Sequence, residues 1–284
     1  MKKTILITGT SSGLGMSMAA RLASRGYRVY ATMRDISRQD DLVNETRRRG
    51  GISNLTIFKM DVTSRVSIQE AVAAVTEDGN GLDVLVNNAG YNTKGFFEDL
   101  SDEDIRAQFE VNFFGALNVT REVLPLMRPR RRGLIINMSS MAAFYGKPVS
   151  SAYVSSKWAL EGFTECLAME LMPLGINIVL VEPGSYRTKI LDNIRWARDF
   201  DNPTSPYYEK SQQYRFFLQS VALKNRRDPE EMAVVVERLI ESDRPRFRTS
   251  IGLYSKLLAI AVRVLPFRLY ARRFYRNCFV CFKR

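Results

Sequence analysis

Apolar and polar residues follow two periods along most of this chain. Short apolar runs, typical of strands covered on both faces, alternate with longer stretches in which apolar residues return every three or four positions, as in a helix. Strands are expected near residues 3–8, 28–33, 55–60, 82–87, 134–138 and 176–181. Helices fill most of the intervals, including 102–127 and 152–172. This alternation predicts the α/β class, with a doubly wound parallel sheet in a single domain.

Turn and polar residues fall just after four of the predicted strands, namely Gly9, Asn88, Ser140 and Pro183. Ligands of a doubly wound sheet bind at the carboxyl ends of its strands, so these four positions should converge on one edge. The first of these turns, residues 9–15, is glycine-rich and leads into an amphipathic helix at about 15–24. Glycines allow close backbone approach and a helix N-terminus attracts anions, which predicts a phosphate site.

Tyr153 and Lys157 are four residues apart and would share one face of a helix. A nearby positive charge lowers the pKa of a phenol from its reference value of about 10, so the two residues form a tunable acid/base couple. Ser140 would deliver a hydroxyl from the end of a strand. Its neighbour Ser139 should point to the opposite side of that strand and is the weaker candidate. This spacing also occurs by chance, so its meaning depends on the motifs before it.

Together these motifs resemble those of the classical short-chain dehydrogenase/reductase family over about residues 1–245, nearest its hydroxysteroid/retinol-dehydrogenase-like branch. The matching segments are Thr8-Gly9-Thr10-Ser11-Ser12-Gly13-Leu14-Gly15, Asp61-Val62, Asn87-Asn88-Ala89-Gly90 and Pro183-Gly184, with a tetrad of Asn112, Ser140, Tyr153 and Lys157. The resemblance implies a Rossmann fold. It also implies hydride transfer between a nicotinamide cofactor and a ketone or secondary alcohol.

The resemblance assigns roles to the tetrad. Tyr153 would move a proton to or from the substrate oxygen, and Ser140 would orient that oxygen. Lys157 would hold the nicotinamide ribose and lower the pKa of Tyr153, while Asn112 would hold a water in a proton relay. Without the resemblance, Asn112 would be interpreted as a polar helix residue whose side chain hydrogen-bonds to nearby backbone groups. The implied cofactor-binding set is Gly9, Ser11, Ser12, Gly13, Leu14, Gly15, Arg34, Asp61, Val62, Asn88, Ala89, Gly90, Tyr153, Lys157, Pro183, Gly184 and Thr188.

The end of the second strand bears on the choice of cofactor. An acidic residue there would bond to the adenosine ribose, whereas an arginine would accommodate a 2′-phosphate. Arg34 stands at this junction, with Asp35 one step later, and Ser11 and Ser12 could donate to a phosphate. We therefore predict NADP(H) rather than NAD. Relatives that use NADP often carry a basic residue in the glycine turn, where this chain has Ser12.

Composition excludes several other functions. The chain has no histidine, which excludes a Ser-His-Asp triad and a His-ligated metal, and we predict no metal site. It has no run of 18 apolar residues, it enters a strand directly, and its three cysteines form no disulfide framework. These features predict a cytoplasmic protein, and no nucleic-acid motif is present.

The positive charge is concentrated at the C-terminal end. Residues 244–284 carry eleven Lys/Arg and no Asp/Glu, whereas residues 1–243 are almost neutral. We predict a basic amphipathic extension at 246–284, with an apolar segment at 256–265 that Pro266 ends. Beyond it, one helix side would carry Arg268, Arg272, Arg273 and Arg276, and the other Phe267, Tyr270 and Phe274. This helix could lie on an anionic membrane surface, or it could pack its apolar side on the body or another subunit.

Aromatic residues concentrate in 185–226, which we predict to be a substrate loop with short helices for a lipophilic ketone or alcohol. Two alternatives remain: reduction of 3-oxoacyl groups on an acidic carrier protein, and a non-catalytic regulatory protein on the same fold. By resemblance the chain forms a homodimer or homotetramer through helices 102–127 and 152–172. The apolar stripe of the second helix would serve there, although core packing explains it equally well: Leu160, Phe163, Leu167 and Leu171.

Overall fold

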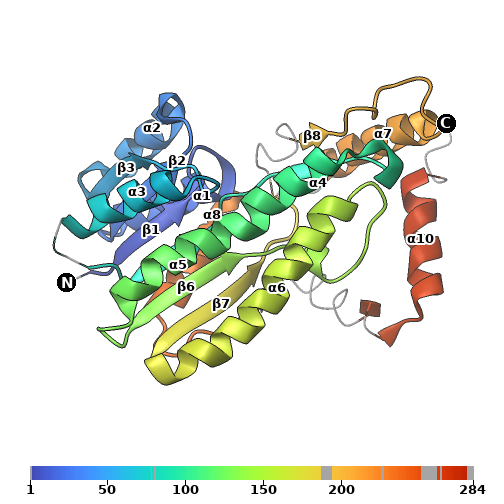
Figure 1. The fold of residues 1–284 in the computed structure, drawn as a ribbon. Helices are drawn as coiled ribbons and strands as arrows, with labels where there is room; N and C mark the ends of the chain where they lie inside the picture. Colours follow the sequence, from blue (N-terminus) through green and yellow to red (C-terminus); the bar gives the residue numbers. More distant parts are fainter. Residues whose placement is uncertain are drawn as a thin grey trace.

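A parallel seven-stranded sheet forms the centre of the molecule (Figure 1). The computed structural model describes residues 2–77, 79, 81–186, 194–224, 227–250, 261–262 and 264–279. The strand order is β3-β2-β1-β4-β6-β7-β9, and every neighbouring pair is parallel. The bounds are β1 Thr4–Thr8, β2 Arg28–Met33, β3 Leu55–Lys59, β4 Val84–Asn87, β6 Gly133–Met138, β7 Ile176–Glu182 and β9 Arg248–Ser250. The order reverses between β1 and β4, which confirms the predicted doubly wound Rossmann fold.

Helices cover both faces of this sheet. One face carries α1 (Gly13–Ser24) and α8 (Pro229–Glu241), with α2 (Asp40–Arg48) beside α1, and the other carries α3 (Arg65–Glu77), α5 (Gly115–Met127) and α6 (Ser151–Leu171). Ile5 and Ile7 of β1 pack among the α1 and α8 side chains, whereas Leu6 packs with α3 and α5. All three are fully buried. A strand covered on both faces needs such a continuous apolar run, because neither of its sides meets water.

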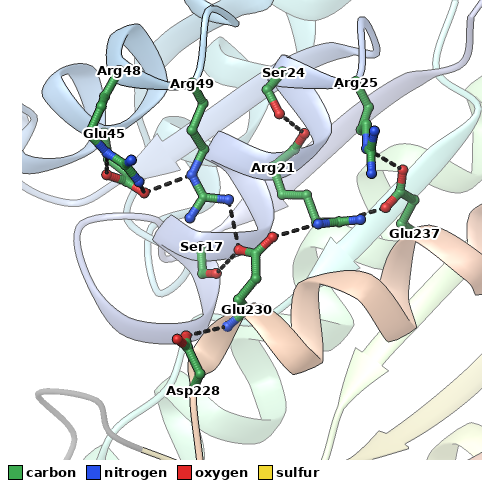
Figure 2. Close-up of polar contacts among 10 residues, drawn as sticks. All are labelled: Ser17, Arg21, Ser24, Arg25, Glu45, Arg48, Arg49, Asp228, Glu230 and Glu237. Atoms are coloured by element: carbon green, nitrogen blue, oxygen red, sulfur yellow. Dashed lines mark hydrogen bonds and ion pairs between the residues drawn. The ribbon is translucent and has the colours of Figure 1, made fainter.

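A network of ion pairs joins three of these helices (Figure 2). Arg21 of α1 contacts both Glu230 (2.6 Å) and Glu237 (2.5 Å) of α8. Arg49, directly after α2, contacts Glu230 at 2.7 Å and Glu45 of α2 at 2.6 Å. These groups share partners and are partly buried, so they hold one another in place more firmly than isolated surface pairs. The network fixes α1, and the glycine turn begins at the other end of that helix.

Three elements differ from their sequence predictions. The single helix expected at 102–127 is divided into α4 (Asp102–Phe109), a π-helical segment (Glu110–Phe114) and α5. The predicted substrate segment 185–226 contains a 17-residue helix, α7 (Tyr208–Lys224), rather than short helices. The sheet extends to Ser250 in β9, past the domain boundary predicted at residue 245. The sequence Arg-Thr-Ser of β9 has no apolar run, so its pattern could not reveal an edge strand.

A smaller unit adjoins the sheet on the side where the substrate was expected. Strand β5 (Asn92–Lys94) pairs in parallel with β8 (Ile194–Trp196). Beside this pair, α7 contacts the C-terminal helix α10 (Phe267–Phe279). Their side chains form a separate apolar cluster around Phe200, which is fully buried, and Tyr214. Aromatic residues of the predicted substrate segment therefore pack in or against this cluster: Trp196, Phe200 and Phe217.

Helix α10 packs part of its apolar side on the body of the protein. Phe274, Cys278 and Phe279 join the Phe200 cluster, as the packing alternative for the tail expected. Phe267 and Leu269, at the N-terminal end of the helix, are 69% and 58% exposed. Most of the predicted apolar segment 256–265 lies outside the described residues. Helix α10 is therefore divided into a packed C-terminal half and an N-terminal end that presents apolar side chains to solvent.

Candidate active site

The glycine turn lies at the carboxyl end of β1 and packs directly against the turn after β4. Gly9 has a φ of +70°, and a Cβ on it would lie 2.7 Å from Cα of Ala89. A Cβ on Gly15 would overlap the carbonyl oxygen of Gly9 and the amide of Asn88. Larger residues at either position would push these segments apart, because no space is left for a Cβ. Gly9 in addition has a left-handed φ, which favours glycine. The absence of a side chain at these two glycines thus lets the two turns pack in direct contact.

Asn88 locks the two turns together. Its Nδ2 donates to the carbonyl oxygens of Thr8 and Gly9, each at 2.9 Å. The backbone N–H groups of Asn88 and Ala89 both donate to Oγ1 of Thr8 at 3.0 Å. Asn88 and Ala89 therefore fix the shape of the glycine turn through hydrogen bonds within the chain. The contacts with a cofactor that the sequence predicted would come in addition.

The cradle opens toward the N-terminus of α1. Ser12 occupies the N-cap position in an extended conformation, and its side chain makes no capping hydrogen bond. The first N–H groups of a helix need partners, and an anion supplies them where no side chain does. The residues present therefore fit a pyrophosphate-bearing cofactor in the turn that contains Gly13, Leu14 and Gly15.

Tyr153 and Ser140 meet at the carboxyl end of β6. Tyr153 lies in the first turn of α6 and is 9% exposed, and Ser140 is the second residue after the end of β6 at Met138. The Ser140 Oγ accepts the Ala142 N–H at 3.0 Å, which leaves the Ser140 hydroxyl proton to bond with Tyr153. Burial raises the pKa of Tyr153, and the hydrogen bond with Ser140 opposes this rise. The phenol is therefore a protonated group that can donate to a substrate oxygen.

Lys157 lies one turn beyond Tyr153 on α6 and is 6% exposed. Its Nζ donates to the Met138 carbonyl oxygen at 2.8 Å, and burial lowers its pKa to about 8. The sequence analysis expected Lys157 to lower the pKa of Tyr153. In this structure the group that lowers the pKa of Tyr153 is Ser140, and the Lys157 ammonium is bonded to the carbonyl oxygen at the end of β6.

Asn112 lies in the π-helical segment and is 1% exposed. Its Oδ1 accepts the Tyr91 N–H and its Nδ2 donates to the Tyr91 carbonyl oxygen, both at 3.0 Å. The side chain thus fixes the backbone just after Gly90. This is the role in backbone hydrogen bonding that was expected for Asn112 without the family resemblance. Single π turns occur often at functional sites, because they displace a carbonyl from the regular helical pattern.

A cluster of charged residues behind Lys157 was not found from the sequence. Glu161, one turn further along α6, is 7% exposed, and its pKa is raised by burial although Ser139 and Arg248 oppose this. Arg248 of β9 reaches Glu161, and its Nη1 lies 2.7 Å from Oε1 of the buried Glu182. The charge of Glu161 also acts on Lys157, whose pKa it raises against the effect of burial. No local motif marks this cluster, since its members come from three separate elements.

Arg34 lies exposed at the end of β2, beside a surface cleft. The cleft is also lined by Lys59, Asp61, Ser64, Val66, Ser67 and Glu70. Lys59 pairs with Met33 in the sheet register, so it lies next to Arg34, and sequence analysis did not single it out. Asp61 uses Oδ1 to accept from the Thr63 N–H at 2.9 Å, and Val62 is buried against Gly115. The cleft thus combines two cations with two carboxylates.

The remaining predicted contacts follow β7. The carbonyl oxygen of Pro183 accepts the Met141 N–H at 3.0 Å, which ties the Pro183-Gly184 turn to the loop after Ser140. Thr188 lies outside the described residues. Apart from Thr188, the structure thus brings the predicted cradle, tetrad and β7 turn to the carboxyl edge of one sheet.

This edge has the geometry of a dinucleotide-binding site beside an acid/base tyrosine. The chain belongs to the short-chain dehydrogenase family, whose model matches residues 3–199. It is therefore an oxidoreductase that acts on CH–OH or C=O groups.

Two curated relatives and one solved structure illustrate the similarity. A 3-ketodihydrosphingosine reductase of Bacteroides thetaiotaomicron is 34% identical over 92% of this chain and 93% of its own. Human retinol dehydrogenase 8 is 33% identical over 98% of this chain and 91% of its own. A short-chain dehydrogenase/reductase from Burkholderia phymatum, solved in complex with NAD, is 25% identical, with a TM-score of 0.78, 98% coverage of this chain and 96% of that one. Other solved structures of the fold contain NADP, so the class of cofactor is NAD(P).

Proposed function

We propose that this chain is an NADP(H)-dependent oxidoreductase that interconverts a lipophilic ketone and the corresponding secondary alcohol. The proposal rests on one observation. The carboxyl edge of the sheet that carries the glycine turn also carries Tyr153, Ser140 and Lys157. The neighbouring aromatic cluster and the names of the two relatives, which refer to a sphingoid base and to retinol, support a lipophilic substrate. A screen of NADPH and NADH oxidation with steroid, retinoid, sphingoid and 3-oxoacyl carbonyl compounds tests it. Turnover of none of these would contradict it.

The proposed mechanism assigns each residue one task. The nicotinamide supplies the hydride when the cofactor is bound. Tyr153 donates its phenolic proton to the carbonyl oxygen, and the hydrogen bond that Ser140 donates to the phenol holds the phenol in position for this transfer. Lys157 then returns a proton toward Tyr153 and holds the cofactor ribose. Because the Asn112 side chain is bonded to Tyr91, a relay through this residue would use its main-chain carbonyl and a water.

Two other functions are weaker. A regulatory protein on this fold needs no acid/base pair, whereas here Tyr153 and Lys157 are both present and buried. Reduction of a 3-oxoacyl group on an acidic carrier protein would use the basic residues of α10 as a docking surface. The substrate screen separates these functions, because the carrier alternative requires turnover of carrier-bound substrate above that of free lipid carbonyls.

The cofactor preference rests on Arg34. Arg34→Ala should weaken NADPH binding by roughly tenfold to a hundredfold, the loss expected for a charge-assisted hydrogen bond to phosphate, and should leave NADH nearly unchanged. Fluorescence titration of both cofactors measures this. Arg38→Ala is the matched control, since Arg38 is an exposed arginine nearby that does not line the cleft. Equal losses for the two cofactors would show that Arg34 does not select the phosphate.

We further propose that the N-terminal end of α10 binds anionic membranes, which would bring the enzyme to lipophilic substrates. Phe267 and Leu269 are exposed apolar residues at this end, Val264 is exposed just before the helix, and the exposed Arg272 and Arg273 follow Leu269 within about one turn. Apolar insertion and about 1 kcal/mol from each basic residue near an anionic surface would act together. Among the described residues, no helix combines the length and the hydropathy needed to cross a membrane.

Liposome flotation at low salt tests membrane binding. The full chain should float with phosphatidylserine vesicles and much less with neutral ones. Phe267→Ser/Leu269→Ser should remove the binding while leaving folding intact, because both side chains are already exposed. Val66→Ser, at an apolar residue of α3 that is 63% exposed, is the control. Point variants are preferable to a chain ending at Gly252, which would also remove Cys278 and Phe279 from the core. No flotation of the full chain would reject the proposal.

A cytoplasmic dimer or tetramer remains part of the proposal. The helix stripe on which the sequence analysis based it is core, since Leu160, Leu167 and Leu171 are buried within the single chain. The same region of the surface exposes Trp158 (50%) and Met169 (66%), which are better candidates for a contact between copies.

A further inference from the structure

Two lysines lie close together beside the start of α6, outside the site described above. Lys94, the last residue of β5, is 5% exposed and hydrogen-bonds through Nζ to Oγ of Ser150, the N-cap of α6. Lys147 lies partly buried in the loop that leads to α6. Their Nζ atoms lie 5.7 Å and 4.9 Å from the ring centroids of Tyr214 and Tyr145 respectively. Aromatic faces and a hydroxyl thus surround the two ammonium groups.

No acidic side chain pairs with either lysine in the described part of the chain. Burial lowers the pKa of Lys94 to about 7 and that of Lys147 to about 8, and the charge of Lys147 lowers that of Lys94 further. Cys278 of α10 is the nearby group that could balance them, but burial raises the pKa of its thiol to about 11, so it is neutral. Buried cations are normally paired, because leaving water without a partner is costly. This pair therefore lacks an anion.

The position of the pair relates it to the reaction. Lys147 lies on the segment between Ser140 and Tyr153, and Lys94 lies on the segment that follows the Gly90 turn. Val149 and Ala152 belong to the same apolar cluster as Phe200 and Phe279, so the start of α6 contacts both the lysine pair and the aromatic residues. Figure 1 shows α7 and α10 at the end of the molecule where α6 begins. The pair thus flanks the substrate side of the proposed site.

We propose that Lys94 and Lys147 bind an anionic group, a carboxylate or a phosphate, at the end of the lipophilic substrate away from its carbonyl. This inference rests on the proposed function and narrows its substrate class to amphiphilic anions. The two ammonium groups supply the donors that an oxyanion needs. The positive end of the α6 dipole adds to them. The adjoining aromatic cluster makes the surroundings of the pair apolar, which suits an anion that carries an apolar chain. Because Lys147 is partly exposed, an anion can approach the pair from solvent.

Binding of simple amphiphiles tests this subsite without any need for turnover. Isothermal titration would use the full chain saturated with oxidised cofactor, and dodecanoate, dodecyl phosphate and dodecanol as probes. At least one anion should bind about tenfold or more tightly than dodecanol, as expected for charge-assisted hydrogen bonds. Comparison of the two anions tells a carboxylate site from a phosphate site. Equal affinities for all three probes would overturn the proposal.

Matched variants assign the preference to the lysines. Lys94→Met and Lys147→Met keep a side chain of similar length and remove its charge. Each variant should therefore lose about tenfold in anion affinity, while its affinity for dodecanol stays unchanged. Lys147→Arg should keep the preference. Lys210→Met is the control, because Lys210 is an exposed lysine of α7 whose Nζ lies 5.9 Å from the Tyr275 ring of α10. Wild-type anion affinity in both Met variants would overturn the assignment.

Thermal unfolding separates a binding role from a structural one. The Met variants should unfold at the wild-type temperature or higher, since an unbalanced buried charge is replaced by an apolar chain. A lower unfolding temperature combined with an unchanged anion preference would show that the lysines are structural and would refute the subsite. The proposed function would fail differently: anions would still bind preferentially, but no carbonyl compound would be reduced.

Discussion

Tyr153→Phe is expected to abolish turnover while the protein stays folded and keeps its affinity for the cofactor. The substitution removes one oxygen atom, which is the atom that would donate the proton to the substrate. Loss of a general acid typically costs about 10²–10⁴-fold in rate. The phenyl ring preserves the packing of the buried side chain against Ala142 and Val154. The loss should therefore appear in kcat, with little change in cofactor affinity or unfolding temperature.

The size of this effect depends on the hydrogen bond between Tyr153 and Ser140. Ser140→Ala should also reduce kcat strongly, because the phenol loses the group that orients it and opposes the rise of its pKa. Ser139→Ala is the matched control, since Ser139 is the neighbouring serine and acts on the pKa of Glu161 rather than on that of Tyr153. Steady-state kinetics with the best carbonyl compound of the screen measures all three variants. Wild-type kcat in Tyr153→Phe would rule out the mechanism.

The central sheet was predictable because its strands are covered on both faces. Runs such as Ile5-Leu6-Ile7 must be apolar throughout, so they stand out from the helical periods around them. Strand β9 has no such signal, since its short sequence is partly exposed and, among the described strands, it pairs with β7 alone. The π-helical segment at 110–114 was also invisible, because a π turn changes hydrogen bonding without changing the apolar pattern at that point.

The site could be predicted where its functional residues lie close together in the sequence. The spacing of Tyr153 and Lys157 is a property of one helix, and the glycine turn is continuous in sequence. The pKa of Tyr153, however, depends on what surrounds it after folding. Glu161 and Arg248 come from different elements, so neither could be connected with Lys157 before the fold was known. Lys94 likewise looks like an ordinary polar residue of a short strand until its burial is seen.

The largest remaining effect is expected for Lys157, which serves both the cofactor and the proton transfer. Lys157→Met should reduce kcat/KM by about 10³-fold or more, since a general acid/base contribution is lost together with a contact to the cofactor. Cofactor affinity should fall as well, in contrast to Tyr153→Phe. Glu161→Gln is the comparison, because it changes the charge behind the lysine without removing the lysine. Wild-type cofactor affinity in Lys157→Met would contradict the role of Lys157 in cofactor binding.

The pH dependence gives Lys157 a signature of its own. Its ammonium has a pKa of about 8, so its charge is fully present below that pH and is lost as the pH rises through it. Tyr153 has a raised pKa and stays protonated over the same range. The kcat/KM for the reduced cofactor, which reports ionisations of the cofactor-free enzyme, should therefore fall as the pH rises above about 8. Lys157→Arg should move this fall to higher pH, because a guanidinium keeps its proton there. A profile unchanged by this substitution would assign the ionisation to another group and would remove Lys157 from the proton path.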